Sequence, residues 1–248
     1  MNARPKKTIP SKTEILEILR EGKADLKGQF VLGSNYTFLV QLSHGGKSFQ
    51  AVYKPQKGEM PLWDFPAESL AARESAAFLV SEALGWELVP PTIMRADGPL
   101  GSGSYQFFIV HDPQLHYFSF DDATRDRLRP TALFDLIINN ADRKGGHILL
   151  DENDHLWLID HGLCFHAQPK LRTVIWDFSG EPIENELLES LQNLLRDLQA
   201  KTEIQQQLSQ LLQKNEIDAL KSRIKFYIDH PVYPAPDENQ RQFPWPLV

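Results

Sequence analysis

Two acidic residues at the ends of a short hairpin pattern constrain the fold of this chain more than any other feature. Asp142 opens the segment DRKGGH, and Asp160 lies in the segment IDHG. Between them, the apolar runs 148–150 and 156–159 flank a turn-rich segment, which predicts a strand, a turn and a strand. Folding this hairpin carries Asp142 back beside Asp160. Such a pair favours a phosphoryl-transfer site, in which one carboxylate orients an acceptor hydroxyl and the other holds a metal; two solvated acids in a surface turn are the alternative.

An upstream turn and a lysine add the groups that such a site needs for a nucleotide. The segment 31–40 has the pattern of a strand, a small polar turn and a return strand, and 49–54 forms a further strand that ends at Lys54. Lys54 can then reach phosphates under the turn, whose backbone N–H groups can approach oxygens closely. A single glycine makes the turn a weak signal, and Lys54 alone also fits a surface lysine. The candidate nucleotide-binding residues of the turn are Gly33, Ser34 and Asn35.

A glutamate on a predicted helix is the partner that a buried lysine needs. Apolar residues at helical spacing predict a helix over 70–84, and Glu74 falls in its first turns. Because a buried cation requires a paired carboxylate, we expect Lys54 to pair with Glu74. Glu68 and Glu82 are the competing partners.

Five fragments, in this order and spacing, carry a resemblance to a known family. They are AVYKP at 51–55, RESAA at 73–77, VPPT at 89–92, NNADRK at 139–144 and IDHG at 159–162. The chain resembles the phosphatidylinositol 3- and 4-kinase-like family, and most closely its small bacterial members of unassigned substrate. The similarity extends over roughly residues 30–180.

The resemblance implies an α+β, two-lobed protein-kinase-like fold, with a small antiparallel-sheet N-lobe, a mainly helical C-lobe and ATP between them. It implies that Lys54 contacts phosphate and that Glu74 orients Lys54. It also implies that Asp142 is the catalytic acid or base and that Asp160 holds the metal. It does not imply a lipid acceptor.

The chain departs from the family pattern at two positions of the Asp142 segment. Where the family places an asparagine as a second metal ligand, this chain has His147. An imidazole suits manganese or zinc better than magnesium, so we expect Asp160 and His147 to hold Mg²⁺ or Mn²⁺, with a preference for manganese. A histidine that only supports the loop is the alternative. Lys144 stands where the lipid kinases have histidine, and it fits either a phosphate contact or a solvated loop lysine.

A strand followed by an extended linker predicts the hinge between the lobes. The segment 105–110 is strongly strand-like, and Pro113 disfavours helix in the residue before it. Backbone groups near Ile109, Val110 and His111 are therefore the candidate adenine contacts, in a pocket walled by apolar side chains such as Val52 and Ile159. An ordinary core strand is the alternative.

Leucines dominate the second half of the chain. They recur at three- and four-residue steps over 184–212, with a possible break near Lys201, and predict an amphipathic helix on the C-lobe; a coiled-coil dimer is the alternative. Further helices are expected over 11–21, where Ser11 and Glu14 fit a capping box, over 131–139 and over 217–228. The predicted organisation is a single kinase-like domain, 1–248, with an N-lobe at 11–110, a C-lobe at 111–230 and a C-terminal tail at 231–248.

Composition restricts the partners and the compartment. With 248 residues, of which 42% are hydrophobic, the chain can form one core or two small lobes around a cleft. Its formal net charge of −7 argues against a nucleic-acid partner. Cys164 is the only cysteine, and we find neither a signal-peptide pattern nor an apolar run of membrane-spanning length, so we expect a cytoplasmic protein without a transmembrane segment.

Together these observations predict an ATP-dependent phosphotransferase whose acceptor, a protein, a lipid head group or a small molecule, is not defined. Three alternatives remain open. The chain is a nucleotide-binding pseudokinase if His147 has replaced an essential metal ligand, or an AMP transferase if the nucleotide binds inverted. A structural interaction protein built around the leucine helix would have no affinity for nucleotide. The oligomeric state is not defined.

Overall fold

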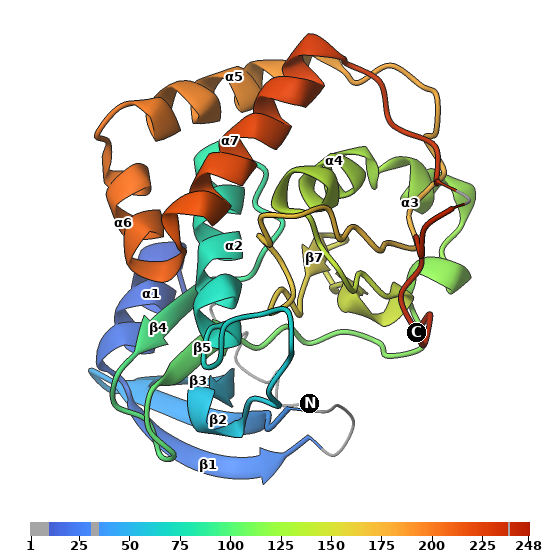
Figure 1. Ribbon diagram of the computed structural model, residues 1–248. Coiled ribbons are helices and arrows are strands. Elements are labelled where there is room, and N and C mark those ends of the chain that lie inside the picture. Colours follow the sequence, from blue (N-terminus) through green and yellow to red (C-terminus); the bar gives the residue numbers. More distant parts are fainter. Residues whose placement is uncertain (1–9, 31–34, 238) are drawn as a thin grey trace.

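A five-stranded antiparallel sheet forms the smaller lobe in a computed structural model that describes residues 10–30, 35–237 and 239–248 (Figure 1). Its spatial order is β1-β2-β3-β5-β4. Helix α1 (Lys12–Glu21), which begins at the predicted Ser11–Glu14 capping box, packs on one face. A core around Val40, Ala51 and Tyr53 lies between α1 and the sheet. The strands are β1 (Lys23–Gln29), β2 (Phe38–His44), β3 (Lys47–Pro55), β4 (Thr92–Arg95) and β5 (Gly103–Phe107).

The first strand lies earlier in the chain than the sequence pattern predicted. We expected it to begin at Val31, whereas β1 ends at Gln29. Its sequence, KADLKGQ, contains only one large apolar residue, Leu26, which is exposed, so no alternation of apolar and polar residues marks it. The predicted return strand corresponds to β2. Residues 31–34, which include Gly33 and Ser34, lie outside the part of the chain that the structure describes.

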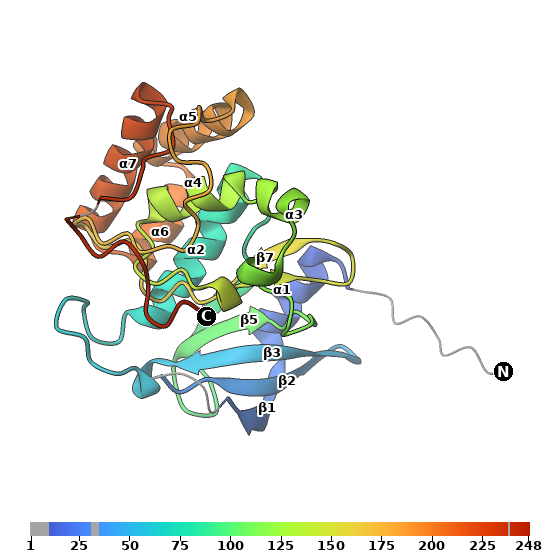
Figure 2. The same cartoon turned by 90° about the vertical axis from the view of Figure 1, so that its right-hand side faces the viewer.

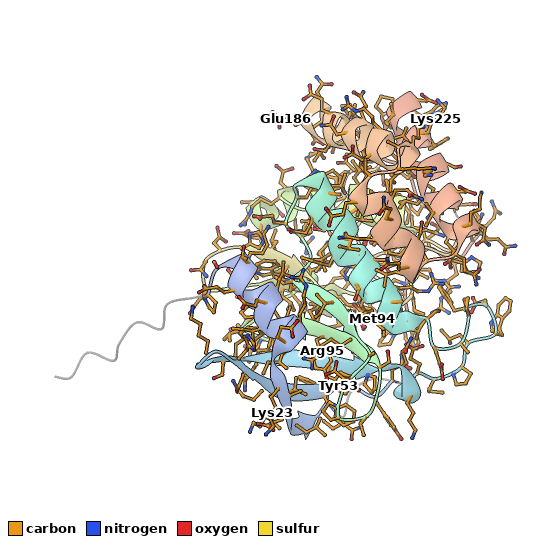
Figure 3. The ribbon with its side chains drawn as sticks, turned by 90° about the vertical axis from the view of Figure 1, so that its left-hand side faces the viewer. Lys23, Tyr53, Met94, Arg95, Glu186 and Lys225 are labelled. Carbon is orange, nitrogen blue, oxygen red and sulfur yellow. The ribbon has the colours of Figure 1, made fainter. Side chains whose placement is uncertain are left out.

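Helix α2 (Leu70–Leu84) connects the two lobes (Figure 3). Gly85, whose φ of 71° is left-handed, ends it. Ala76, Phe78 and Val80 belong to the larger core, which is formed mainly by the C-lobe. Within the small lobe, Arg95 of β4 donates to the backbone carbonyls of Leu19 and Gly22 at the C-terminal end of α1.

The C-lobe is mainly helical and contains a two-stranded hairpin, β6–β7 (Figure 1). The leucine-rich segment forms two helices that break between Gln199 and Glu203, and Leu191, Leu194 and Leu198 are buried within the lobe. This stripe therefore has its partners in the same chain, which removes the basis for the coiled-coil alternative. The elements are α3 (Asp122–Asp126), α4 (Arg129–Ile138), β6 (Ile148–Leu150), β7 (Leu156–Leu158), α5 (Asn185–Gln199), α6 (Glu203–Leu211) and α7 (Lys214–Asp229).

A buried ion pair fastens α2 to the C-lobe. The Arg73 guanidinium pairs with Glu216 of α7 and also donates to the Cys164 carbonyl at 2.5 Å. Both side chains are almost completely buried. After α7, the tail returns along the C-lobe toward the smaller lobe (Figure 2). Among the helices of the described residues, we find none with the length and apolar character needed to cross a bilayer.

Candidate active site

Lys54 meets two carboxylates at the boundary between the lobes. It lies at the end of β3, where its ammonium forms an ion pair with Glu74 of α2 and lies 2.8 Å from Asp160 Oδ1. The Glu74 side chain is only 3% exposed, whereas that of Asp160 is 50% exposed. The competing partner Glu82 is instead paired with Lys12. Lys54, Glu74 and Asp160 thus form a triangle of charges. The buried Glu74 fixes Lys54 on one side, and a ligand can reach the triangle on the side of the exposed Asp160.

The charges of this triangle shift one another's proton affinities. Burial disfavours the charged form of Lys54, but the neighbouring Asp160 and Glu74 carboxylates outweigh it and raise the pKa of Lys54. The Lys54 cation lowers the pKa of Asp160 strongly, against the opposing effect of burial. Both groups are therefore charged at neutral pH. Asp160 also has a φ of 64°, a left-handed conformation that aspartate tolerates better than most residues.

Asp142 lies in the loop between α4 and the hairpin, beside the same triangle. Its backbone N–H donates to the Asn140 side chain at 3.0 Å, and its Oδ2 lies 3.2 Å from the Lys144 ammonium. Burial raises the pKa of Asp142, although the Lys144 cation opposes this shift. The positive charge of Arg172, in the segment after Asp160, also acts to lower that pKa. Asp142 therefore has a higher proton affinity than a solvated aspartate.

A second, fully buried cluster supports these loops, and the sequence patterns did not reveal it. Asp135 of α4 accepts hydrogen bonds from Arg143, including one of 3.0 Å, and from Asn140 at 2.9 Å. Arg143 also donates to the Ile159 carbonyl at 3.0 Å and lies 2.8 Å from His161 Nε2. It thereby joins the Asp142 loop to the segment that carries Asp160. The available signal was an aspartate inside the apolar run of α4, where a charged residue needs a buried partner.

His147 lies beside Asp160, at the position where the family pattern has asparagine. Its Nε2 is 3.3 Å from Asp160 Oδ2. Burial lowers the pKa of His147 to about 4, so the imidazole is neutral and able to ligate at ordinary pH. Within the described residues, no group of three or more histidine, cysteine, aspartate and glutamate side chains is arranged to hold a metal. Two donors fit a metal that arrives with nucleotide phosphates, since Mg²⁺ is commonly held by one or two protein carboxylates, phosphates and water.

One cavity of about 160 Å³ joins the candidate catalytic residues. The charged side chains in its wall come from β3, α2 and the two loops around the hairpin. Glu59 also lines it, and its carboxylate accepts the N–H groups of Leu70 and Ala71 at the start of α2; the sequence analysis did not single out this residue. Asn35 is the predicted turn residue that the cavity includes. The site residues in its wall are Asn35, Lys54, Glu74, Asp142, Lys144 and Asp160.

The predicted hinge residues do not line this cavity. The predicted strand 105–110 is too long, because β5 ends at Phe107 and the chain then leaves β3 after a hydrogen bond from Phe108 to Gln50. Ile109 is buried, Val110 is exposed, and His111 Nδ1 lies 3.0 Å from the Ile109 carbonyl oxygen. Ile109 and Val110 instead line a separate cavity of about 350 Å³ beside α1.

A small antiparallel sheet beside a helical lobe, with a Lys–Glu pair and two aspartates at the boundary between them, defines a kinase-like protein. A model of the family described as phosphatidylinositol 3- and 4-kinase matches residues 68–217, a range that includes Glu74, Asp142, His147 and Asp160. The chain belongs to this family. Lys54 lies N-terminal to the matched range.

Two known proteins show further similarity. Protein Rv2133c of Mycobacterium tuberculosis is 38% identical over 264 residues, which cover 92% of this chain and 94% of the relative. The crystal structure of a Helicobacter pylori proinflammatory kinase, CtkA, covers 87% of this chain and 94% of its own, with 10% identity and a TM-score of 0.49.

Proposed function

We propose that this protein is an ATP-dependent phosphotransferase that moves the terminal phosphoryl group of ATP to an acceptor hydroxyl. The observation that carries the proposal is the convergence of Lys54, Asp142 and Asp160 on one cavity, from three separate segments of the chain. Glu74 holds Lys54 from the buried side. A phosphoryl-transfer site requires this combination of a cation, a metal-binding carboxylate and a carboxylate near the acceptor.

The proposed roles follow from the surroundings of each residue. The ammonium of Lys54 donates charge-assisted hydrogen bonds to phosphate, and its pairing with Glu74 reduces the freedom that it would lose on binding. Asp142 accepts the proton of the acceptor hydroxyl, which its raised proton affinity favours. Lys144, beside Asp142, is placed to neutralise negative charge on the transferred group.

Asp160 and His147 are the residues that would hold the metal. A bound Mg²⁺ or Mn²⁺ would neutralise charge on the phosphates. The Lys54 ammonium lies 2.8 Å from one oxygen of the Asp160 carboxylate, and His147 Nε2 lies 3.3 Å from the other. Metal and nucleotide are thus expected to bind cooperatively, since each supplies charge that the other compensates.

Calorimetry and an acceptor screen test the proposal. ATP should bind in the presence of Mg²⁺ or Mn²⁺, and label from the terminal phosphate should pass to a protein, a lipid head group or a small molecule. Asp142→Asn should lower the rate of transfer about 10²- to 10⁴-fold while ATP binding persists. The mass of the product distinguishes a transferred phosphoryl group from transferred AMP. Absence of ATP binding with either metal would refute the proposal.

His147 favours one second candidate, a nucleotide-binding pseudokinase. It replaces the asparagine of the family pattern and lies against the metal-binding Asp160. This candidate predicts ATP binding that neither metal alters and no transfer to any acceptor or to water. The same calorimetric titrations, with and without metal, separate the two functions.

A further inference from the structure

The tail after α7 consists of two parts that are held very differently. In the first part, Tyr233 is buried, its N–H donates to the Glu181 carbonyl at 3.0 Å, and its carbonyl accepts from Gly180 at 2.8 Å. Its hydroxyl lies 3.1 Å from the Arg129 carbonyl oxygen. In the second part, residues 239–248, Phe243, Trp245 and Val248 have large exposed side chains. We refer to residues 239–248 as the strap.

The strap lies against the two segments that frame Asp142 (Figure 2). The Gly145 N–H of the Asp142 loop donates to the Leu247 carbonyl at 2.7 Å, and the Thr173 N–H donates to the Gln242 carbonyl at 3.0 Å. Pro244, between these two contacts, is buried, and the Phe243 ring meets Trp176 edge-on at 6.5 Å. The strap is therefore held chiefly through its backbone carbonyls, one proline and one aromatic contact.

The surface beneath the strap has the features of a site for an extended polypeptide. Arg143 and Thr173 form a parallel bridge, in which the Arg143 N–H donates to the Arg172 carbonyl at 2.9 Å. Thr173 donates its own N–H to the strap. The Asp142 loop, the segment at Thr173 and the strap therefore lie side by side. Addition of an extended segment through main-chain hydrogen bonds, with side-chain pockets supplying specificity, is a common mode of peptide recognition. This surface is close to the proposed catalytic residue in the chain, because Gly145 follows Asp142 by three residues.

We infer that the strap is a detachable internal ligand that occupies a polypeptide-binding surface beside Asp142, formed by Gly145, Thr173 and Trp176. An acceptor polypeptide must displace the strap before its own carbonyls can bond to Gly145 and Thr173. The weak burial of the strap's side chains makes displacement feasible, while the anchored part at Tyr233 keeps the strap close to its site. The competition with an acceptor rests on the proposed phosphotransferase activity, whereas the docking of the strap does not.

Removal of residues 239–248 tests the docking without any assay of activity. A fluorescently labelled peptide with the sequence of residues 239–248 should bind the truncated chain at least tenfold more tightly than the full chain, whose own strap already occupies the surface. Amide hydrogen exchange at Gly145 and Thr173 should accelerate at least tenfold on truncation. Exchange at Leu158, whose N–H donates to Leu88 in the core at 2.7 Å, should not change. Equal peptide affinities, or unchanged exchange at Gly145 and Thr173, would overturn the inference.

Pro244→Ala in the full chain provides a second test that leaves the length of the chain intact. It should weaken docking of the strap and raise exchange at Thr173, with Pro236→Ala, an exposed proline outside the strap, as the matched control. Equal exchange in the two variants would contradict the inferred docking.

Once a polypeptide acceptor has been identified, truncation should raise kcat/KM for that acceptor at an unchanged ATP affinity. A lower kcat/KM at unchanged ATP affinity would show that the strap supports the active site and would refute its competition with the acceptor. A full chain that binds no ATP would refute the proposed phosphotransferase activity, but the docking test would remain valid.

Discussion

Two charge clusters share the same loops but have opposite surroundings. Asp142 and Asp160 face a cavity, whereas the next residue in each segment, Arg143 and His161, is completely buried. We refer to Lys54, Glu74, Asp142 and Asp160 as the cavity cluster. This cluster is partly solvated, so its charged side chains can exchange their contacts with one another for contacts with a ligand. The buried cluster, centred on Asp135, has no exposed side chain and fixes where the loops lie. In each loop, the residue that faces the cavity is followed directly by the residue that holds the loop in place. Substitutions in the cavity cluster should therefore affect activity, whereas substitutions in the buried cluster should affect stability.

The largest expected effect is on turnover, at Asp142. Asp142→Asn removes the acceptor for the hydroxyl proton and should lower kcat about 10²- to 10⁴-fold. The thermal midpoint and ATP affinity should change little, because Asp142 contributes no buried ion pair to the fold. Asp154→Asn, in the turn of the hairpin and exposed, is the matched control and should retain full activity. If Asp142→Asn keeps half of the wild-type turnover, Asp142 is not the catalytic base.

The buried cluster should respond in stability. Asp135→Asn leaves the Arg143 guanidinium buried without its countercharge, which should lower the free energy of unfolding by about 3–5 kcal/mol. Asp126→Asn breaks only a surface pair with Arg129 and should cost less than about 1 kcal/mol. Urea denaturation of the two variants measures the difference. Equal costs would show that Asp135 does not carry the positioning that we assign to its cluster.

The sequence predicted the cavity cluster better than the buried cluster for a physical reason. Lys54 lies at the end of β3, and the two aspartates lie in the loops after α4 and β7, where turn residues and changes of periodicity mark local structure. Glu74 lies in the first turns of α2, whose apolar spacing marks the helix. The Arg73–Glu216 pair, which is equally buried but lies outside the Asp135 cluster, joins residues 143 positions apart, and each residue alone resembles an ordinary exposed helical charge. No local pattern encodes such a contact, just as none marked β1. The resemblance named Lys54, Glu74, Asp142 and Asp160, which the structure places around one cavity, but it gave no indication of the buried contacts behind them.

The two histidines beside these clusters should make stability depend on pH. Burial lowers the pKa of His147 to about 4, and burial together with Arg143 lowers that of His161. The unfolded chain binds these protons near pH 6.5, before the folded chain does. The stability that the neutral imidazoles contribute is thus fully present above pH 6.5 and is lost as the pH falls toward 4. For His147, this loss of unfolding free energy is on the order of 3 kcal/mol.

Denaturation of the metal-free protein at several pH values between 7 and 4 measures this loss. His147→Asn should make the decline in unfolding free energy shallower, since asparagine does not titrate, while the contribution of His161 persists. An equally steep decline in the variant would contradict the shift assigned to His147.

Binding of ATP should depend on Lys54 to a smaller extent. A charge-assisted hydrogen bond contributes roughly 1.5–3 kcal/mol, so Lys54→Ala should weaken ATP binding at least tenfold in calorimetry. Cooperative unfolding should persist. Lys47→Ala removes a lysine at the opposite end of β3 and should leave ATP affinity unchanged. Unaltered affinity in a folded Lys54→Ala protein would remove Lys54 from the phosphate site.

The smallest expected effect, a change in metal preference at His147, bears most directly on the cavity cluster. If the imidazole ligates, Mn²⁺ should support ATP binding or turnover several-fold better than Mg²⁺, because nitrogen is a poor ligand for the harder ion. His147→Asn supplies an amide oxygen and should shift the ratio toward Mg²⁺. The low pKa of His147, about 4, predicts that the wild-type ratio stays constant from pH 7.5 to 5.5. A ratio near one that His147→Asn does not change would place His147 with the buried cluster, as a residue that positions Asp160 without touching the metal.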